Sequence, residues 1–155
     1  MPKSNDTKKR YLKSVGQRNA FIHQLSDRIS FSFSFFQSGK GSGQSFEDWE
    51  KDNYLSDLNN KLKVFSDKNK QELLQSRILE LYDGYPKGSR FTQPLALPNQ
   101  NVKWARFRLT GARRLIGFFV PPVLGKDEAR DDDYKNVFYI VFLDKNHEFA
   151  PYHKK

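Results

Sequence analysis

The chain has 155 residues, 37% hydrophobic and 15% aromatic, a composition typical of one globular domain rather than of a disordered chain. It contains no cysteine, which excludes a disulfide framework, a thiolate zinc site and a cysteine nucleophile. The formal net charge of +9 favours a nucleic acid or an acidic protein as partner.

The charged residues are segregated along the chain. Residues 1–27 hold six basic and two acidic residues, and residues 84–126 hold eight basic residues and no acidic one. Residues 127–133, which follow directly, hold five acidic residues. A surface that is merely solvated does not require this segregation, so we expect the basic regions to bind an anionic partner.

Residues 1–27 read as a basic N-terminal extension, which either forms a loose helix or remains a mobile arm, and which either binds phosphate or is only solvated. The domain itself is placed at residues 28–155. The start of the chain lacks the apolar core of a signal peptide, and the longest apolar run, residues 137–143, is too short to cross a bilayer. We therefore expect a cytoplasmic protein that has no membrane partner.

The domain opens with a predicted strand at residues 28–37, RISFSFSFFQ, because apolar residues alternate there with serines. GKGSGQS, residues 39–45, is a flexible turn region and lacks the GxxxxGK[ST] spacing of a phosphate-binding loop. Leucines at helical spacing then predict a helix over residues 55–65. A second helix is expected to be capped by Ser66 and ended by Gly84.

Three further strands follow an irregular loop. The first contains Trp104, Arg106 and Arg108, Gly111 lies in the turn, and the second strand begins at Arg114. The last strand, residues 137–143, is apolar on both faces, as in the middle of a sheet. The fold class is therefore α+β, with a small twisted, mainly antiparallel sheet (β-α-α-β-β-β). A helical hairpin should cover one face, and the other face should be left for solvent or a ligand.

Alternation along the first of these strands places Arg106 and Arg108 on one face, and the turn brings Arg114 back beside them. Three guanidinium groups this close repel one another, so we expect a bound anion such as phosphate to compensate them. The alternative is that acidic residues from elsewhere in the chain form ion pairs with them.

This order of elements and the sequence RFRLTGARRLIGF resemble the RelE/ParE-type toxins of bacterial type II toxin–antitoxin systems. In that family alternating basic residues, a glycine-containing turn and an arginine precede an aliphatic strand, and here Arg106, Arg108 and Arg114 take those positions. Family members that cleave RNA also place polar and aromatic residues after the last strand. FLDKNHEFAPY offers His147, Glu148 and Tyr152 there.

The resemblance implies metal-independent cleavage of mRNA, usually on the ribosome, and neutralisation by an acidic antitoxin protein. The arginines would stabilise charge on the phosphorane and His147 would transfer a proton, with Glu148 as a possible base and Tyr152 as a stacking group. No metal or other cofactor is expected, since the three histidines are far apart in sequence. Further basic residues are expected to bind RNA: Lys87, Arg90, Lys103 and Arg113.

Two alternatives remain open from the sequence. ParE-type members of the same family inhibit DNA gyrase and need no catalytic residues. A nucleic-acid- or protein-binding module of the same fold, without toxicity, is the other. The position of His147 close to the predicted arginine cluster favours the ribonuclease.

Overall fold

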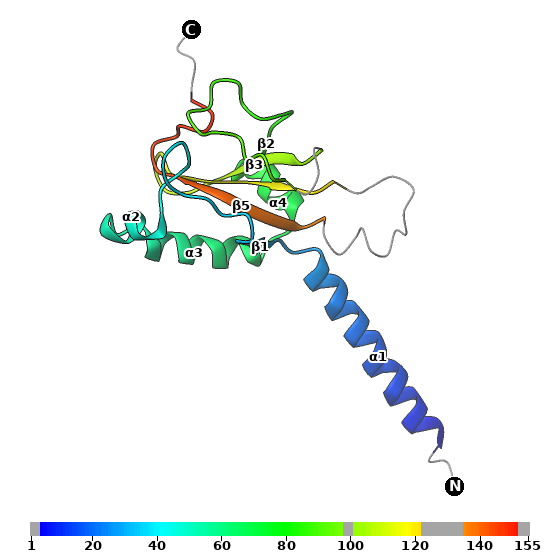
Figure 1. Cartoon of the computed structure of the whole chain (residues 1–155). Coiled ribbons are helices and arrows are strands. Elements are labelled where there is room, and N and C mark those ends of the chain that lie inside the picture. The colour runs from blue at the N-terminus through cyan, green and yellow to red at the C-terminus, as the bar shows by residue number, and fades with distance from the viewer. Residues whose placement is uncertain (1–3, 98–100, 122–134, 152–155) are drawn as a thin grey trace.

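The structure is a computed structural model that describes residues 4–97, 101–121 and 135–151, although not the side chains of residues 4 and 19–24. One long helix precedes the domain, three short helices follow the first strand, and four strands complete the fold (Figure 1). The elements in chain order are α1 (Ser4–Ser26), β1 (Ser30–Ser32), α2 (Phe46–Lys51), α3 (Leu55–Ser66), α4 (Lys70–Gln75), β2 (Leu79–Leu81), β3 (Lys103–Arg108), β4 (Arg114–Phe119) and β5 (Val137–Asp144).

The five strands form one open sheet in the order β1-β5-β4-β3-β2. β1 pairs with β5 in parallel, and every other neighbouring pair is antiparallel. All six residues of β4 are buried, and β5 is almost entirely buried. The α+β class, the mainly antiparallel sheet and the central place of the last strand are therefore confirmed.

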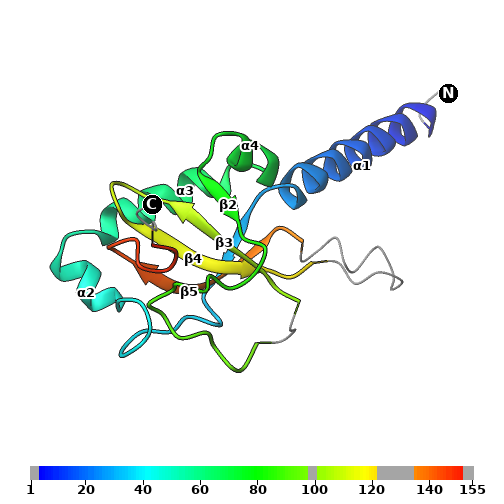
Figure 2. The ribbon, with the colours of Figure 1, turned by 90° about the horizontal axis from the view of Figure 1, so that it is seen from above.

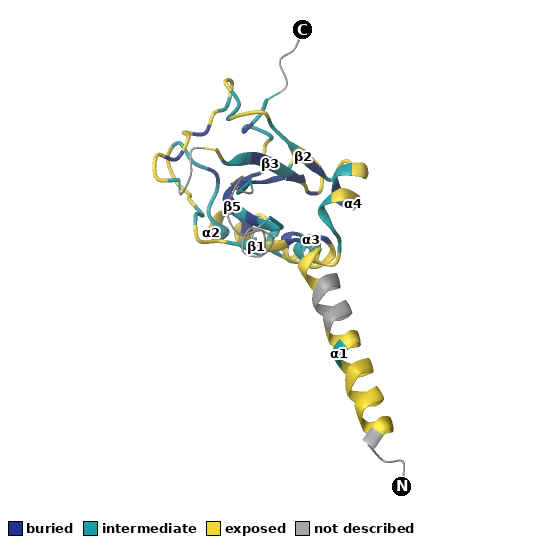
Figure 3. Ribbon diagram, turned by 90° about the vertical axis from the view of Figure 1, so that its right-hand side faces the viewer, coloured by how far each residue is buried: buried dark blue, intermediate teal, exposed yellow. Residues whose placement is uncertain are grey.

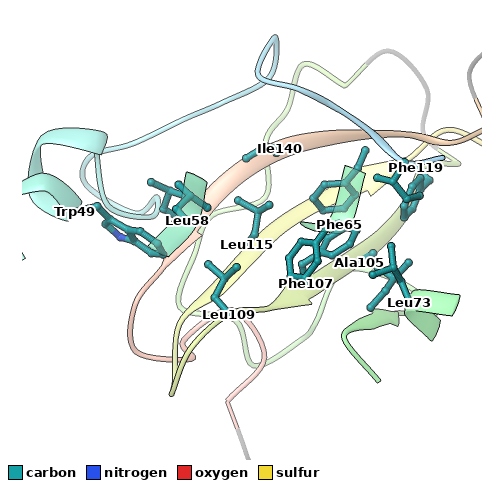
Figure 4. Packing of buried hydrophobic residues seen from close by; sticks show 14 residues of the cluster. Trp49, Leu58, Phe65, Leu73, Ala105, Phe107, Leu109, Leu115, Phe119 and Ile140 are labelled. Atoms are coloured by element: carbon teal, nitrogen blue, oxygen red, sulfur yellow. The ribbon is translucent and has the colours of Figure 1, made fainter. Parts of the chain in front are cut away.

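The main hydrophobic core lies between the sheet and the helices. Trp49 of α2, Leu58 and Phe65 of α3, and Leu73 of α4 all enter this core. Figure 4 shows them around the strand side chains, where the ring of Phe65 stacks on that of Phe107 at 5.2 Å between centroids. Burial of these large side chains, each worth about 1.5–3 kcal/mol, fixes the helices on this face of the sheet.

The opposite face of the sheet is not open along most of its length, which corrects the expectation from sequence. Trp104, Phe118 and Phe142 project from the strands and form a second, mainly aromatic cluster. Phe91, from the loop after β2, and Phe149, from the turn after β5, cover them. Figure 3 shows that burial extends through both sides of the sheet. Only the end of this face near the β3–β4 turn carries polar side chains.

The prediction of a second helix that ends at Gly84 was wrong in its second half. α4 ends at Gln75, the chain reverses direction at Arg77, which has φ of 58°, and β2 follows. The helix begins at a capping box rather than at Ser66, because Asn69 Oδ1 accepts a hydrogen bond from the Glu72 amide at 2.9 Å. The apolar residues that suggested a continuous helix belong partly to a strand, in which Leu79 lies opposite Phe107.

Two other boundaries differ from the prediction. The alternating segment 28–37 forms only a three-residue strand, because the chain turns where the Phe36 amide donates to the Phe33 carbonyl at 3.0 Å. α2 was not predicted; Ser45 begins it by a second capping box. The turn at Gly111, with φ of 64°, is where the sequence placed it.

The N-terminal extension contains α1, a helix of 23 residues that projects away from the sheet and the other helices (Figures 1 and 2). The helical alternative is therefore the one observed. Within the described parts of the chain, no helix is both long and apolar enough to cross a membrane. The acidic segment 127–133 lies outside the described residues.

Candidate functional site

The β3–β4 hairpin brings the three arginines to one face of the sheet. In the register of the hairpin Arg108 lies opposite Arg114, and Arg106 lies opposite Ile116 on the same face. The turn is closed by the Leu109 amide, which donates to the carbonyl of Arg113 at 3.0 Å. The alternation and the glycine turn thus position these side chains as the sequence predicted, at the polar end of the face.

Arg106 is the centre of this polar end. Its Nε donates to Glu80 Oε2 at 2.9 Å, and its Nη2 contacts the same oxygen. Its Nη1 contacts His147 Nε2. The carboxylate and the imidazole therefore hold the guanidinium from two sides. Only 16% of the Arg106 side chain is exposed. Glu80, Arg106 and His147 form the group that we call the Glu–Arg–His cluster.

Glu80 is a site residue that the sequence analysis missed. It lies on β2, directly opposite Arg106 in the β2–β3 register. The segment had been assigned to a helix, in which a cross-strand pairing has no meaning. An ion pair with an acid from elsewhere, the alternative considered for the arginines, is therefore what Arg106 forms.

His147 is positioned by the turn that follows β5. Asp144, fully buried, accepts hydrogen bonds from the Asn146 and Glu148 amides through Oδ1 at 3.2 and 3.0 Å. Its Oδ2 accepts from the Phe149 amide at 2.9 Å. This carboxylate closes a tight turn in which His147 takes φ of 60°, and the turn directs the imidazole to Arg106.

The environment of His147 favours its neutral form. Burial lowers the pKa of the imidazole below 6.5, and the charge of Arg106 lowers this pKa further. Since Nε2 faces an arginine N–H donor, we assign it as the acceptor, which places the ring proton on Nδ1. Once a bound anion takes over this N–H donor, the neutral imidazole can accept a proton from a hydroxyl bound at the same place.

Arg114 and Arg108 differ in what they offer a ligand. Arg114 is only 7% exposed, and its Nη1 donates to the carbonyls of Gly111 and Arg113, each at 2.8 Å, so that it braces the turn. Arg108 is exposed at the end of β3. Within the part of the chain that the structure describes, no carboxylate forms an ion pair with Arg108. Arg108 is therefore the arginine best placed to meet an incoming anion.

Three of the other predicted residues form ion pairs: Arg90, Lys103 and Glu148. Glu148 does not approach Arg106 in the contacts observed, but accepts from Arg90 Nη1 at 3.2 Å. Lys103 Nζ lies 3.4 Å from Asp83 Oδ1. The ion pair of Arg90 and Glu148, with a backbone hydrogen bond between the same residues, ties the loop after β2 to the His147 turn.

Of the remaining predicted residues, the structure places Arg113 apart from the cluster. Arg113 turns to the helical side, where its Nη2 contacts Asp57 Oδ2 of α3 at 3.1 Å and its guanidinium lies 3.9 Å from the centre of the Tyr54 ring. Lys87 is exposed in the loop after β2. Tyr152 lies outside the described residues.

A second residue that sequence reasoning missed is Tyr82, which follows β2. Burial raises the pKa of its phenol to about 12, with a smaller opposing effect of Arg106. Its hydroxyl oxygen is buried and, within the described residues, has no hydrogen-bond partner. Tyr82 therefore stays protonated beside the cluster at any physiological pH. It gives the cluster an apolar wall, which strengthens electrostatic interactions there.

Among the residues that the structure describes, no three acidic or histidine side chains are grouped so that they could hold a metal ion. Comparison with family models, curated proteins and solved structures finds no match. Function must therefore be argued from the geometry of the Glu–Arg–His cluster and from the resemblance carried by the arginine hairpin.

Proposed function

We propose that the protein is a RelE-like toxin that acts as a metal-independent endoribonuclease on mRNA. The observation that carries this proposal is the Glu–Arg–His cluster, in which a neutral imidazole and a carboxylate hold one guanidinium beside the exposed Arg108. Cleavage of RNA without a metal needs a proton acceptor and a fixed positive charge. The cluster supplies both within contact distance of one another.

In the proposed reaction the scissile phosphate binds between Arg108 and Arg106. The bound phosphate takes over the Arg106 Nη1–H that points at His147 Nε2, so that Nε2 can accept the proton of the ribose 2′-hydroxyl. The 2′-oxygen then forms a bond to phosphorus. The bond from phosphorus to the 5′-oxygen breaks, and this oxygen takes a proton from solvent. The products are a 2′,3′-cyclic phosphate and a free 5′-hydroxyl.

Each residue of the cluster has a distinct task in this reaction. Arg106 stabilises the charge that develops on the phosphorane, which typically contributes 10²–10³ in rate for one such donor. Glu80 orients the guanidinium and is not the base, because it is already paired with Arg106. Asp144 fixes the turn that carries His147. Arg114 supports the β3–β4 turn.

The wider role rests on the resemblance in RFRLTGARRLIGF and on the basic composition. It comprises action on mRNA at the ribosome and neutralisation by an acidic antitoxin protein. A segment of such an antitoxin would cover the positively charged end of the sheet, where Arg108 is exposed to receive it or RNA. The ion pairs involved are screened over about 8 Å at physiological ionic strength, so this complex should weaken as salt is raised.

The direct test is cleavage of ribosome-bound and free mRNA in the presence of EDTA, with RNA ends mapped at nucleotide resolution. Arg106→Ala should cleave 10²–10³ times more slowly than wild type, and His147→Ala about 10²–10⁴ times more slowly. Arg28→Ala is the matched control, because Arg28 also forms an ion pair, with Asp67 at 3.2 Å, but outside the cluster.

Thermal unfolding of each variant establishes that it is folded before its activity is compared. Equal cleavage by all four proteins would contradict the role of the cluster. If the wild-type protein leaves RNA intact but inhibits DNA gyrase, the gyrase-inhibitor alternative replaces the ribonuclease.

A further inference from the structure

α1 is a positively charged helix that stands apart from the domain. Within Ser4–Ser26 the helix has five basic residues and a single acidic one, Asp6. The basic side chains are all exposed (Figure 3) and none forms an ion pair with a described residue: Lys8, Lys9, Arg10, Lys13 and Arg18. These five cations belong neither to the second, mainly aromatic cluster nor to the Glu–Arg–His cluster.

The charges are distributed around the whole circumference of α1. Successive residues of an α-helix are rotated by about 100°, so Lys9 and Arg18, nine positions apart, point in opposite directions. Lys8 and Arg10 lie about 100° to either side of Lys9. Viewed along the axis, residues 8–18 therefore have no face wider than about 100° that is free of a cation.

This distribution selects among possible partners. A helix that lies on a membrane needs a broad uncharged face to enter the lipid, and residues 8–18 of α1 have none wider than about 100°. A second copy of α1 would bring equal positive charges together, which is unfavourable. Phosphates on more than one side of the helix, as where the strands of a folded RNA lie close together, complement a cation distribution of this kind.

We propose that α1 is an RNA-binding arm that contacts the phosphate backbone of folded RNA. The helix is about 35 Å long at 1.5 Å per residue, enough to follow several base pairs. Tyr11, 68% exposed, presents an aromatic ring beside these cations, where it can stack on an unpaired base. The choice of RNA rests on the proposed function, and α1 would hold the substrate while the distant cluster cleaves it.

The test measures RNA binding separately from cleavage. Full-length His147→Ala protein, which should bind RNA without cutting it, is titrated by fluorescence anisotropy against a labelled 20-base-pair RNA hairpin between 50 and 200 mM salt. The arm variant carries Lys9→Gln, Arg10→Gln, Lys13→Gln and Arg18→Gln, which keep helix propensity. The matched control removes the same charge from the helical side of the domain, at Lys51, Lys61, Lys63 and Lys68, each replaced by Gln.

Four lost phosphate contacts should lower the slope of log Kd against log salt by about 3.6, since each contributes about 0.9 in a duplex. Between the two salt concentrations, the affinity of the protein with the unaltered arm should consequently fall about 150-fold more than that of the arm variant. The control should change the slope by less than about 1. Circular dichroism verifies that the arm variant retains its helix.

An arm variant that binds the hairpin with unchanged Kd and slope would overturn the proposal. So would RNA binding that is intact while binding to phosphatidylserine vesicles is lost, because the arm would then bind membranes. The proposed ribonuclease is judged on another readout: an arm that binds RNA in a protein with no cleavage would retain this inference and remove the catalytic one.

Discussion

At the scale of single residues, the feature with the greatest chemical consequence is His147 and the carboxylate that positions it. Three backbone amides donate to Asp144, and the turn that they close presents the imidazole to Arg106. Burial and the neighbouring guanidinium lower the pKa of His147, so the ring that contacts Arg106 is neutral at neutral pH. Both the activity and the stability of the protein should therefore respond to acid.

We predict that kcat/KM for RNA cleavage rises with pH through the lowered pKa of His147 and is constant above about 6.5. The sign follows from its role, because only the neutral imidazole can accept the 2′-hydroxyl proton. The measurement is a pH–rate profile under single-turnover conditions. A rate that falls as pH rises through the same range would instead make His147 the proton donor.

The same group links folding to pH. Because the folded pKa lies below the unfolded value of 6.5, the unfolded state binds more protons as pH falls from 6.5 to the folded pKa. We predict that the free energy of unfolding declines over this window in wild type. The decline should be smaller in His147→Gln, as measured by urea unfolding at pH 7.5 and pH 5. Parallel pH dependences in the two proteins would show that His147 is not responsible.

Part of this site was predictable from residue patterns. The shared face of Arg106, Arg108 and Arg114 follows from strand alternation and one turn, which are local properties of the sequence. Glu80 was not predictable once its segment had been assigned to a helix. The pairing that brings it to Arg106 depends on which strand lies at the edge of the sheet, and that is decided by long-range packing.

At the scale of elements, the pairing of β4 with β5 contains an irregularity at Gly117. The register shifts between Ile116 and Gly117, and a Cβ atom added to Gly117 would lie 2.0 Å from the carbonyl oxygen of Tyr139. The two central strands can approach each other here only because this position has no side chain. Since β5 leads directly to His147, the same approach helps to place the imidazole.

We predict that Gly117→Ala lowers the free energy of unfolding by roughly 3 kcal/mol, because the backbone of β5 must move to admit the methyl group. Gly84→Ala is the control: its added Cβ has no atom within 4 Å, and it should change stability by less than about 1 kcal/mol. Urea unfolding of both variants checks this. Similar stabilities for the two would mean that the strands separate at little cost.

The elements themselves were recovered from sequence to different degrees. The helix at residues 55–65 and the strands at residues 114–120 and 137–143 were predicted, because their periodicity coincides with their burial. The strand at residues 28–37 was overestimated: alternation alone cannot show that the chain leaves the sheet after Ser32. Likewise, no local pattern reveals that loop aromatics such as Phe91 cover the second face of the sheet.

At the scale of the whole molecule, α1 and the domain behave as separate parts. All described side chains of α1 from Asn5 to Arg18 are exposed apart from the half-buried Val15. The two cores of the domain draw on residues from Ile29 onward. The described side chains of the N-terminal helix therefore add positive charge at a distance from the sheet rather than packing contacts.

We predict that a chain lacking residues 1–24 unfolds with a free energy within about 0.5 kcal/mol of the full chain, since no side chain that the structure describes in this segment belongs to either core. Ser26 is retained because its carbonyl accepts from Asn136 Nδ2 at 2.7 Å. Urea unfolding followed by tryptophan fluorescence reports on the domain through the buried Trp49 and Trp104. A loss of several kcal/mol would show that α1 packs on the domain.

The parallel pairing of β1 with β5 determines the order in which the protein can be built. β1 is among the first parts of the domain to be synthesised, yet its only neighbour in the sheet is the last strand. During translation the apolar side chains of β3 and β4 remain without their final packing partner until β5 has been synthesised. Contacts between residues so distant in sequence form slowly. The turn bearing His147 comes later still. Neither the sheet nor the Glu–Arg–His cluster can therefore be complete before residues 137–147 have been synthesised.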